Sequence, residues 1–504
     1  MKDSIKLIFV LSLSFVTSVF SEDNNKQALE KIEQTPVSIP VPEVVDKKSE
    51  KMVKEKLFNM IRNGVVVIKA KTRITKCRYY PSTEWEGTGF IADLAKGLIV
   101  TNAHVAGEMN SISSFEIKFG NGTKTEARIE YIDPCYDLAI LSVAPENIPS
   151  DCIALEISDE DIKINMKIFA MGDSWGNSFS TYQGIVFDKY SIIGLKTFPE
   201  QSFQFSGLTV SGASGSPVFR TDGKVVGIIY GGAFVSGCAL PSSYILPIVN
   251  AVKNKEKIKR FFSGCIFEYT TVQDLHEAGV IPTEFFTEYN KQFPEAKNKT
   301  LYVQKRIFSS KKDKEKDGLM AGDVIISIDE TQIGCHLQKI EEIIQKNQDK
   351  KIKVCVYRDG RKENVYMYPT FVAGLENFKL LSFDGATFYE VTDKFLGQKN
   401  GVYIQSPESS SPFHEFYDKG GKLIKTIDGE KIKTLDDIFK IIPNLFKKKW
   451  LKISGTGNNC DDGEIVVWGK HESKIIGEAT YYTYNSEKNA FGVKRIANPV
   501  KSEE

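Results

Sequence analysis

The stretch GTGFIADLAKGLIVTNAH, residues 87–104, decides the fold class of this chain. It holds two short apolar runs, 87–93 and 97–100, which are separated by a turn and followed by polar residues. Short runs rich in β-branched and aromatic residues and bounded by Gly, Asn or Asp are typical of antiparallel strands. Similar runs continue on both sides: GVVVIKA, FEIKFG, ARIEYI, DLAILSV, KIFAMG, YQGIVF, SFQFSG, SPVFR and VVGIIYGG. So many strands at close spacing predict a β-sandwich or barrel domain over residues 57–254.

Two further units follow, and their pattern is different. In the first, residues 260–367, the strand-like LYVQKRIF, AGDVIISID and KIKVCVYRD accompany the helix-like QKIEEIIQKNQ. The second, residues 368–470, repeats this order, because GKLIKTIDGEKIKTLDDIFKIIP parallels GDVIISIDETQIGCHLQKIEEIIQ about 100 residues earlier. Strand, turn, helix and strand in this order predict α+β structure. The chain as a whole is therefore predicted to be mainly β with α+β modules.

The two ends of the chain are predicted to lie outside these units. Residues 1–21 combine two lysines with an apolar run and a small residue at position 21, which is the layout of a secretory signal peptide. The apolar run is shorter than the roughly 20 residues that a membrane-spanning helix needs, so we expect no stable membrane span in the mature chain. An uncleaved anchor or a buried helix is the alternative. Residues 22–56 are predicted to be a solvated linker, with a short docking segment as the alternative, and residues 471–504 a C-terminal tail.

Composition excludes several classes of protein. Among 504 residues, 66 Lys and Arg balance 65 Asp and Glu, whereas a protein built mainly to bind nucleic acid shows a basic excess. With 41% hydrophobic and 26% charged residues, the chain cannot be disordered throughout. The eight cysteines form no CxxC pair and no Cys/His cluster with zinc spacing. The cysteine pattern therefore indicates no zinc site, and the pairing of the cysteines stays open.

Three residues at the edges of predicted strands could form a nucleophilic site. His104 follows GLIVTNA, Asp137 precedes LAILS, and Ser214 lies in the glycine-rich turn VSGASGSPV. A serine hydroxyl needs a neighbouring base, imidazole suits that task near neutral pH, and a buried carboxylate can orient the imidazole. The pattern predicts a catalytic triad. Glycines let the turn close tightly, so the backbone amides of Gly212 and Ser214 are the predicted oxyanion hole.

Each of these assignments has a rival nearby in the sequence. Asp133 precedes a proline and could cap a turn, whereas Asp137 stands directly before an apolar strand. Ser211 and Ser216 compete with Ser214 for the nucleophile. Only Ser214 follows an oxyanion glycine by two residues and precedes a second glycine. We therefore favour Asp137 and Ser214.

The order His104, Asp137 and Ser214, within TNAHV, DLAIL and GASGSPV, resembles trypsin-like serine proteases of the HtrA/Deg family. GLMAGDVIISIDETQI is similar to the core of a PDZ domain of that family. From about residue 57 to about residue 490, the chain resembles the first half of the fungal nuclear HtrA-like pro-apoptotic serine proteases. The resemblance implies a double β-barrel protease domain followed by two PDZ-like domains.

The same resemblance implies an ATP-independent serine endopeptidase for unfolded or damaged proteins, active in protein quality control or apoptosis. Its triad chemistry is expected to require neither a metal nor a cofactor. It implies extended polypeptides as substrates and assembly as a homotrimer or a multiple of one. It also places the walls of the specificity pocket at Leu208, Thr209, Val210, Ile228, Ile229 and Tyr230. None of these residues is acidic. A basic substrate residue before the scissile bond is therefore disfavoured, and we expect a small or medium apolar one.

Several alternatives remain open. Gly264, Cys265, Ile266 and Phe267 are the predicted edge strand that binds peptides by strand addition, but the first PDZ-like unit could instead be a spacer on the protease domain. The whole protein could be a peptide-binding chaperone or scaffold with a latent protease site. A secreted esterase is disfavoured by the order of the triad and by the missing Gly-x-Ser-x-Gly elbow. The signal segment predicts a secretory or extracellular location, and the resemblance implies the nucleus as the alternative.

Overall fold

The structure is a computed structural model, which describes residues 47–75, 84–107, 111–192, 200–207, 209–233, 236–306, 317–348, 350–372, 374, 379–391, 399–405, 407, 410–457, 464–470, 479–485 and 490–497. The chain divides into Met1–Met52 and Val53–Glu504. The predicted signal peptide 1–21 and most of the predicted linker lie outside the described residues. The description below therefore concerns Val53–Glu504.

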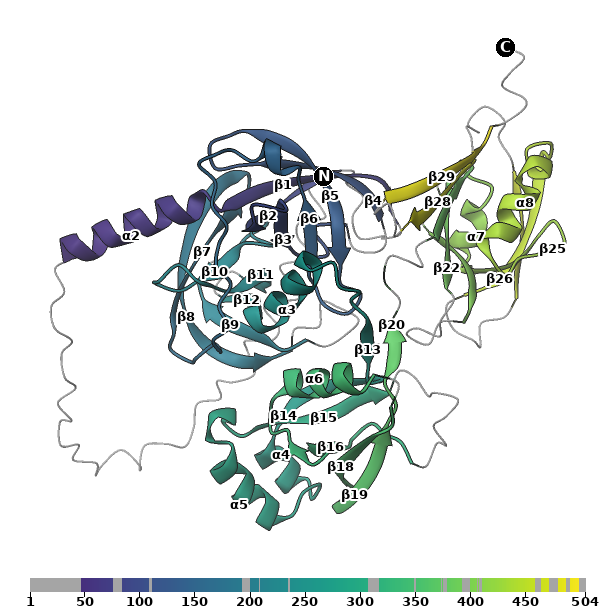
Figure 1. Cartoon of the computed structure of the whole chain (residues 1–504). Helices are drawn as coiled ribbons and strands as arrows, with labels where there is room; N and C mark the ends of the chain where they lie inside the picture. The colour runs from purple at the N-terminus through teal and green to yellow at the C-terminus, as the bar shows by residue number, and fades with distance from the viewer. Residues whose placement is uncertain are drawn as a thin grey trace, which may run out of the picture. The chain divides into compact units, whose positions relative to one another are not determined.

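A closed six-stranded barrel forms first (Figure 1). Its strand order is β1-β2-β3-β6-β5-β4. Every neighbouring pair is antiparallel. Ile68, Ile99 and Phe115 are buried inside the barrel, because alternate residues of a strand point to the same face. The strands are Val65–Thr75 (β1), Glu84–Asp93 (β2), Leu98–Thr101 (β3), Ser111–Lys118 (β4), Lys124–Ile132 (β5) and Ala139–Ser142 (β6).

A second closed barrel follows, with the order β10-β11-β12-β9-β8-β7. Phe203, Phe205 and Val226 fill its interior. The short helix η2 (Pro145–Asn147) precedes this barrel, and α3 (Ser242–Lys253) follows it. The strands are Lys167–Ser174 (β7), Asn177–Ser191 (β8), Ser202–Ser206 (β9), Pro217–Phe219 (β10), Val225–Ala233 (β11) and Ser236–Pro241 (β12). The prediction of a trypsin-like double barrel is confirmed.

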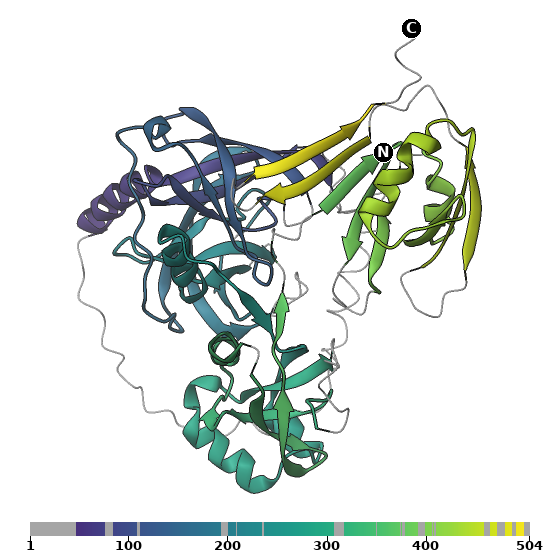
Figure 2. The same ribbon diagram turned by 45° about the vertical axis from the view of Figure 1, so that its right-hand side comes forward.

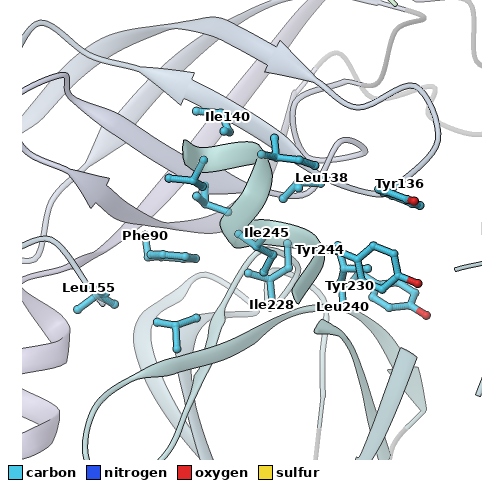
Figure 3. Close-up of a cluster of buried hydrophobic side chains, with 14 of the residues drawn as sticks. Phe90, Tyr136, Leu138, Ile140, Leu155, Ile228, Tyr230, Leu240, Tyr244 and Ile245 are labelled. Carbon is cyan, nitrogen blue, oxygen red and sulfur yellow. The ribbon is translucent and has the colours of Figure 1, made fainter. Parts of the chain in front are cut away.

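The main core lies between the two barrels (Figure 3). Phe90 and Ile140 enter it from the first barrel, Ile228 and Leu240 from the second, and Ile245 from α3. All five side chains are completely buried, and each such burial stabilises the fold by about 1.5–3 kcal/mol. The barrels are therefore held as one unit, and the residues at their junction have fixed positions.

Helix α2 (Lys47–Arg62) occupies the end of the segment that was predicted to be a solvated linker. Its Ile61 is completely buried, and Leu57 and Phe58 pack against the core between the barrels. The sequence pattern did not reveal this helix, because its apolar residues are few and their burial depends on a distant surface.

The first α+β unit contains a sheet with the order β14-β15-β16-β18-β19 and a two-stranded sheet of β13 and β20. Its strands are Arg260–Phe262 (β13), Cys265–Thr271 (β14), Lys299–Arg306 (β15), Val324–Ile328 (β16), Thr331–Gln332 (β17), Ile352–Arg358 (β18), Arg361–Met367 (β19) and Thr370–Val372 (β20). Its helices are Val272–Glu277 (α4), Thr283–Gln292 (α5), Pro294–Ala296 (η3) and Leu337–Asn347 (α6). The predicted strands and helices of this unit are thus present.

The second α+β unit has the same order of strand, short strand, helix and strand. Its elements are Lys379–Phe383 (β21), Ala386–Val391 (β22), Gly401–Gln405 (β23), His414–Asp418 (α7), Leu423–Ile427 (β24), Glu430–Lys431 (β25), Leu435–Leu445 (α8), Trp450–Thr456 (β26), Ile465–Lys470 (β27), Ala479–Asn485 (β28) and Ala490–Ile496 (β29). The sheet continues past residue 470, because β28 pairs with β21 and with β29 (Figure 2). Part of the predicted C-terminal tail is therefore a hairpin of this unit.

Two further findings concern the described part of the chain. None of its helices has the length and apolar character needed to cross a membrane. The six described cysteines, at 135, 152, 238, 265, 335 and 355, are free thiols, and five of these six are buried. These five are packing residues of the cores.

Candidate active site

His104 and Asp137 come together because two neighbouring strands carry them. His104 lies just after β3 and Asp137 just before β6, and Thr101 of β3 pairs with Ala139 of β6. The Asp137 carboxylate accepts two hydrogen bonds, one from His104 Nδ1 at 2.6 Å and one from the His104 backbone N–H at 3.0 Å. With the proton on Nδ1, the Nε2 atom is the free base. The predicted pair is thus assembled, and among the described residues no hydrogen bond to His104 Nε2 is found.

The Asp137 backbone is held from both sides. Asn102 Nδ2 donates to the Asp137 carbonyl at 2.9 Å, and the Asp137 N–H donates to Glu200 Oε2 at 3.1 Å. Both partners are buried, so these hydrogen bonds are shielded from competing water. Asp137 itself is 2% exposed, whereas the His104 side chain is 22% exposed. A fixed carboxylate therefore supports an imidazole that can still reach a substrate.

Asp133, the rival carboxylate, has a different role. One of its oxygens accepts the N–H groups of Cys135 and Tyr136, both at 2.9 Å. The other oxygen accepts the Tyr131 hydroxyl at 2.8 Å and pairs with the Arg260 guanidinium at 2.5 Å. Asp133 therefore caps the turn that leads to Asp137, as its position before a proline suggested.

Ser214 lies in a turn that two glycines close. Gly212 has φ +94° and Gly215 has φ +85°, a region that favours glycine. A Cβ atom on Gly215 would lie 1.9 Å from the Thr88 carbonyl oxygen and 2.6 Å from Thr101 Oγ1. The turn is thus pressed against β2 and against the end of β3, the strand that leads to His104.

Thr88 joins the serine turn to the first barrel. Its N–H donates to the Ser214 carbonyl at 2.8 Å, and its hydroxyl donates to the Gly212 carbonyl at 2.9 Å. Its own carbonyl accepts the Thr101 hydroxyl at 2.7 Å. One residue of β2 therefore fixes both the serine turn and the strand before the histidine.

The rival serines occupy different positions. Ser216 is completely buried, Ser211 is exposed, and Ser214 is half-buried. A buried hydroxyl cannot meet a substrate, so Ser216 is a packing residue. Among the hydrogen bonds of the described residues, none joins Ser214 to His104. Hydrogen bonds of this kind are often long before substrate binds and shorten in the reactive complex.

The predicted oxyanion hole uses amides that the turn leaves available. Ala213, Gly215 and Ser216 donate their N–H groups to the carbonyls of Val210, Ile229 and Ala213, respectively. In the described part of the chain, the amides of Gly212 and Ser214 donate to no carbonyl. These are the two donors that the sequence assigned to the oxyanion.

The predicted specificity residues are only partly accessible. Leu208 lies outside the described residues, while Thr209 and Val210 are half-buried. Ile228 and Tyr230 point into the core between the barrels, and Ile229 into the second barrel. The Tyr230 hydroxyl is hydrogen-bonded to Ser202 Oγ, and burial raises the pKa of Tyr230. The pocket assignment stays a prediction.

The predicted peptide-binding residues lie on a terminal strand. Gly264 precedes β14, which pairs with β15 and ends the sheet order of its unit. Cys265 and Phe267 are buried in the core of that unit, and Ile266 is half-buried. Strand addition uses a terminal strand of this kind, but the Cys265 N–H already donates to Ser263 Oγ at 3.0 Å. The peptide-binding role stays a prediction.

Sequence reasoning missed the residues that hold the site together. Thr88 and Glu200 belong to none of the quoted motifs around the triad, and Thr101 lies within TNAHV without an assigned role. Asn102 lies within the quoted TNAH, yet no role was assigned to it. Within the described residues, no group of three or more His, Cys, Asp or Glu side chains could hold a metal ion.

Residues 87–228 match the family model of the trypsin-like peptidase domain. The "Pro-apoptotic serine protease NMA111" of Scheffersomyces stipitis is 25% identical over 412 residues, which cover 77% of this chain and 40% of that protein. The protein of the same name from Saccharomyces cerevisiae is 23% identical over 431 residues, covering 83% and 42%. The chain therefore spans about two-fifths of the length of these relatives.

Among solved structures, the "HtrA-type protease AlgW with decapeptide" is similar, with a TM-score of 0.45, 19% identity, and coverage of 63% of this chain and 98% of that one. The family model confirms the resemblance to trypsin-like serine proteases over residues 87–228, and the curated relatives are serine proteases by name. Residues 87–228 form a trypsin-like peptidase domain.

Proposed function

We propose that this chain is an ATP-independent serine endopeptidase of the HtrA type, which cleaves unfolded or damaged polypeptides. The observation that carries the proposal is the hydrogen bond of 2.6 Å from His104 Nδ1 to Asp137, beside a serine turn fixed to the same strands. A bound, buried carboxylate stabilises the imidazolium that forms during the reaction.

The reaction has two similar halves. Ser214 Oγ attacks the carbonyl carbon of the scissile peptide bond while His104 Nε2 takes the hydroxyl proton. The oxyanion receives hydrogen bonds from the amides of Gly212 and Ser214. The C–N bond then breaks, and His104 gives its proton to the departing amine. Water repeats the sequence on the acyl-enzyme, releasing the acid and restoring Ser214.

The substrate preference depends on the residues assigned to the specificity pocket. Of the residues assigned to the specificity pocket, Thr209 and Val210 are half-buried and carry no charge, so we expect the site to disfavour Lys and Arg before the scissile bond and to favour small or medium apolar residues. The position of β14 at the end of its described sheet supports binding of extended peptides by the first PDZ-like domain. Assembly as a homotrimer or a multiple belongs to the same proposal and is tested by the mass of the protein in solution.

The location is the second part of the proposal. The signal segment 1–21 favours the secretory pathway, whereas similarity to the fungal relatives favours the nucleus. N-terminal sequencing of the mature protein, combined with cell fractionation, decides between them.

Labelling with a serine-directed fluorophosphonate tests the nucleophile. The wild-type protein should be labelled, and Ser214→Ala should not. Ser211→Ala, which alters an exposed serine of the same turn, is the matched control and should be labelled like the wild type. The wild type and Ser211→Ala should also cleave an unfolded protein, and Ser214→Ala should not. Equal labelling of wild type and Ser214→Ala would refute the assignment.

A peptide-binding chaperone with a latent protease site is the second candidate. The missing hydrogen bond between Ser214 and His104 favours it, because an idle site need not be aligned. The absence of labelling and of cleavage in the wild type, together with binding of an unfolded chain, would establish this function instead.

A further inference from the structure

Trp175 is the most exposed of the large apolar side chains in the described part of the chain, at 72%. It lies in the turn between β7 and β8 and has φ +54°. An L-residue with a side chain rarely adopts this conformation, and such strain persists only where the surroundings impose it. The two-residue hairpin imposes it here, because Ser174 pairs with Asn177 and Gly176 also has φ +80°. The feature that remains to be explained is the exposure of the indole.

The surroundings hold this turn firmly. Asp173, which is 1% exposed, donates its N–H to Thr88 Oγ1 at 2.8 Å. Its carboxylate accepts the Gly176 N–H at 2.9 Å, and its carbonyl accepts the Tyr182 hydroxyl at 3.1 Å. The turn is therefore a rigid support for the side chain of Trp175.

The support is attached directly to the serine turn. The Trp175 N–H donates to the Ser211 carbonyl at 3.0 Å, one residue before Gly212. A Cβ atom on Gly212 would lie 2.5 Å from Asp173 Oδ1, so the two turns are in contact. The exposed indole therefore belongs to a turn that is bonded to the nucleophile's own turn.

The two ends of the serine turn are held by different elements. The Gly215 N–H donates to the Ile229 carbonyl, and the Ile229 N–H donates to the Ser216 carbonyl. Ile229 belongs to β11, a strand assigned to the pocket for the substrate residue before the scissile bond. Ser211 and Gly212, at the other end, contact the turn of Trp175. The pocket for the part of the substrate before the scissile bond is assigned to Thr209, Val210 and β11, whereas the turn of Trp175 belongs to neither segment, so we assign this turn to the part of the substrate beyond the scissile bond.

We propose that Trp175 forms a subsite for the leaving-group side of the substrate, where its ring contacts an apolar side chain just after the scissile bond. This inference rests on the proposed function. Aromatic rings supply a large contact area at a small cost in conformational entropy. A contact with the leaving group acts only until the C–N bond breaks, because that part of the substrate departs before deacylation.

Two matched substrates test the subsite. The first is a peptide with apolar residues on both sides of the scissile bond, and the second is an ester with the same acyl part and a nitrophenolate leaving group. Trp175→Ala should lower kcat/KM for the peptide about 10-fold or more and leave the ester rate unchanged. Trp175→Phe should restore part of the loss. Ile185→Ala, which removes another exposed apolar side chain at 49% exposure, is the control and should change neither rate.

The outcomes separate this subsite from a merely structural role. An equal loss on both substrates would mean that Trp175 supports the serine turn, and no loss on either would mean that substrate does not touch it. Both results overturn the inference while leaving the proposed function intact. A wild-type protein that cleaves neither substrate and resists fluorophosphonate would overturn the proposed function, and the inference with it.

Discussion

Replacement of Asp137 by Asn should lower kcat by about 10⁴ and change the fold little. The Asp137 carboxylate accepts both the backbone N–H of His104 and its Nδ1–H. An amide has only one accepting oxygen. If this oxygen keeps the backbone N–H, the amide nitrogen faces Nδ1, and the imidazole proton moves to Nε2. The base that Ser214 needs is then absent, and an inverted tautomer of this kind costs about 10⁴ in kcat, or about 5.4 kcal/mol of activation free energy.

The stability change should be much smaller than the kinetic one. The Asp137→Asn variant would lose one charge-assisted hydrogen bond, which is worth about 1.5–3 kcal/mol. The assay is steady-state cleavage of a peptide substrate, with the amount of folded protein checked by denaturant unfolding. Asp151→Asn is the control, since it alters an exposed carboxylate of the same domain that does not touch His104. A kcat for Asp137→Asn within tenfold of the wild type would refute the reasoning.

Three further predictions concern stability and the serine turn. Asp133→Asn should lower the free energy of unfolding by about 3–5 kcal/mol, because it leaves the buried Arg260 guanidinium without its counter-charge; urea unfolding that matches the wild type would contradict this. Gly215→Ala should abolish fluorophosphonate labelling and destabilise the fold by at least about 2 kcal/mol, since its Cβ would lie 1.9 Å from the Thr88 carbonyl oxygen; normal labelling would show that the turn can adjust. Thr434→Ala removes the capping box of α8 and should cost about 1 kcal/mol, measured as faster hydrogen exchange in that helix; unchanged exchange would show that the cap contributes nothing.

The described elements show where sequence reasoning succeeds. The strands of both barrels were predictable because each is a short run of β-branched and aromatic residues bounded by turn residues, and these preferences act locally. His104, Asp137 and Ser214 could be chosen for a similar reason. Few residue types can perform their chemistry, and each lies at the edge of a predicted strand.

The misses have a common physical origin. Helix α2 has few apolar residues, and its Ile61 is buried only because the core between the barrels packs against it. Hairpin β28–β29 gains its stability from pairing with β21, about 100 residues earlier. Local preference says little about either element, because the partner that stabilises it is remote in the sequence.

The amino-acid sequence by itself determined the β-rich class of the first domain, the α+β order of the next two units and the identity of the candidate triad. Only the tertiary structure decided how that triad is held. Thr88 reaches Gly212 across 124 positions, and Glu200 reaches Asp137 across 63. Such contacts form when two barrels pack together, and a hydrogen bond between distant residues leaves no periodic pattern in the chain.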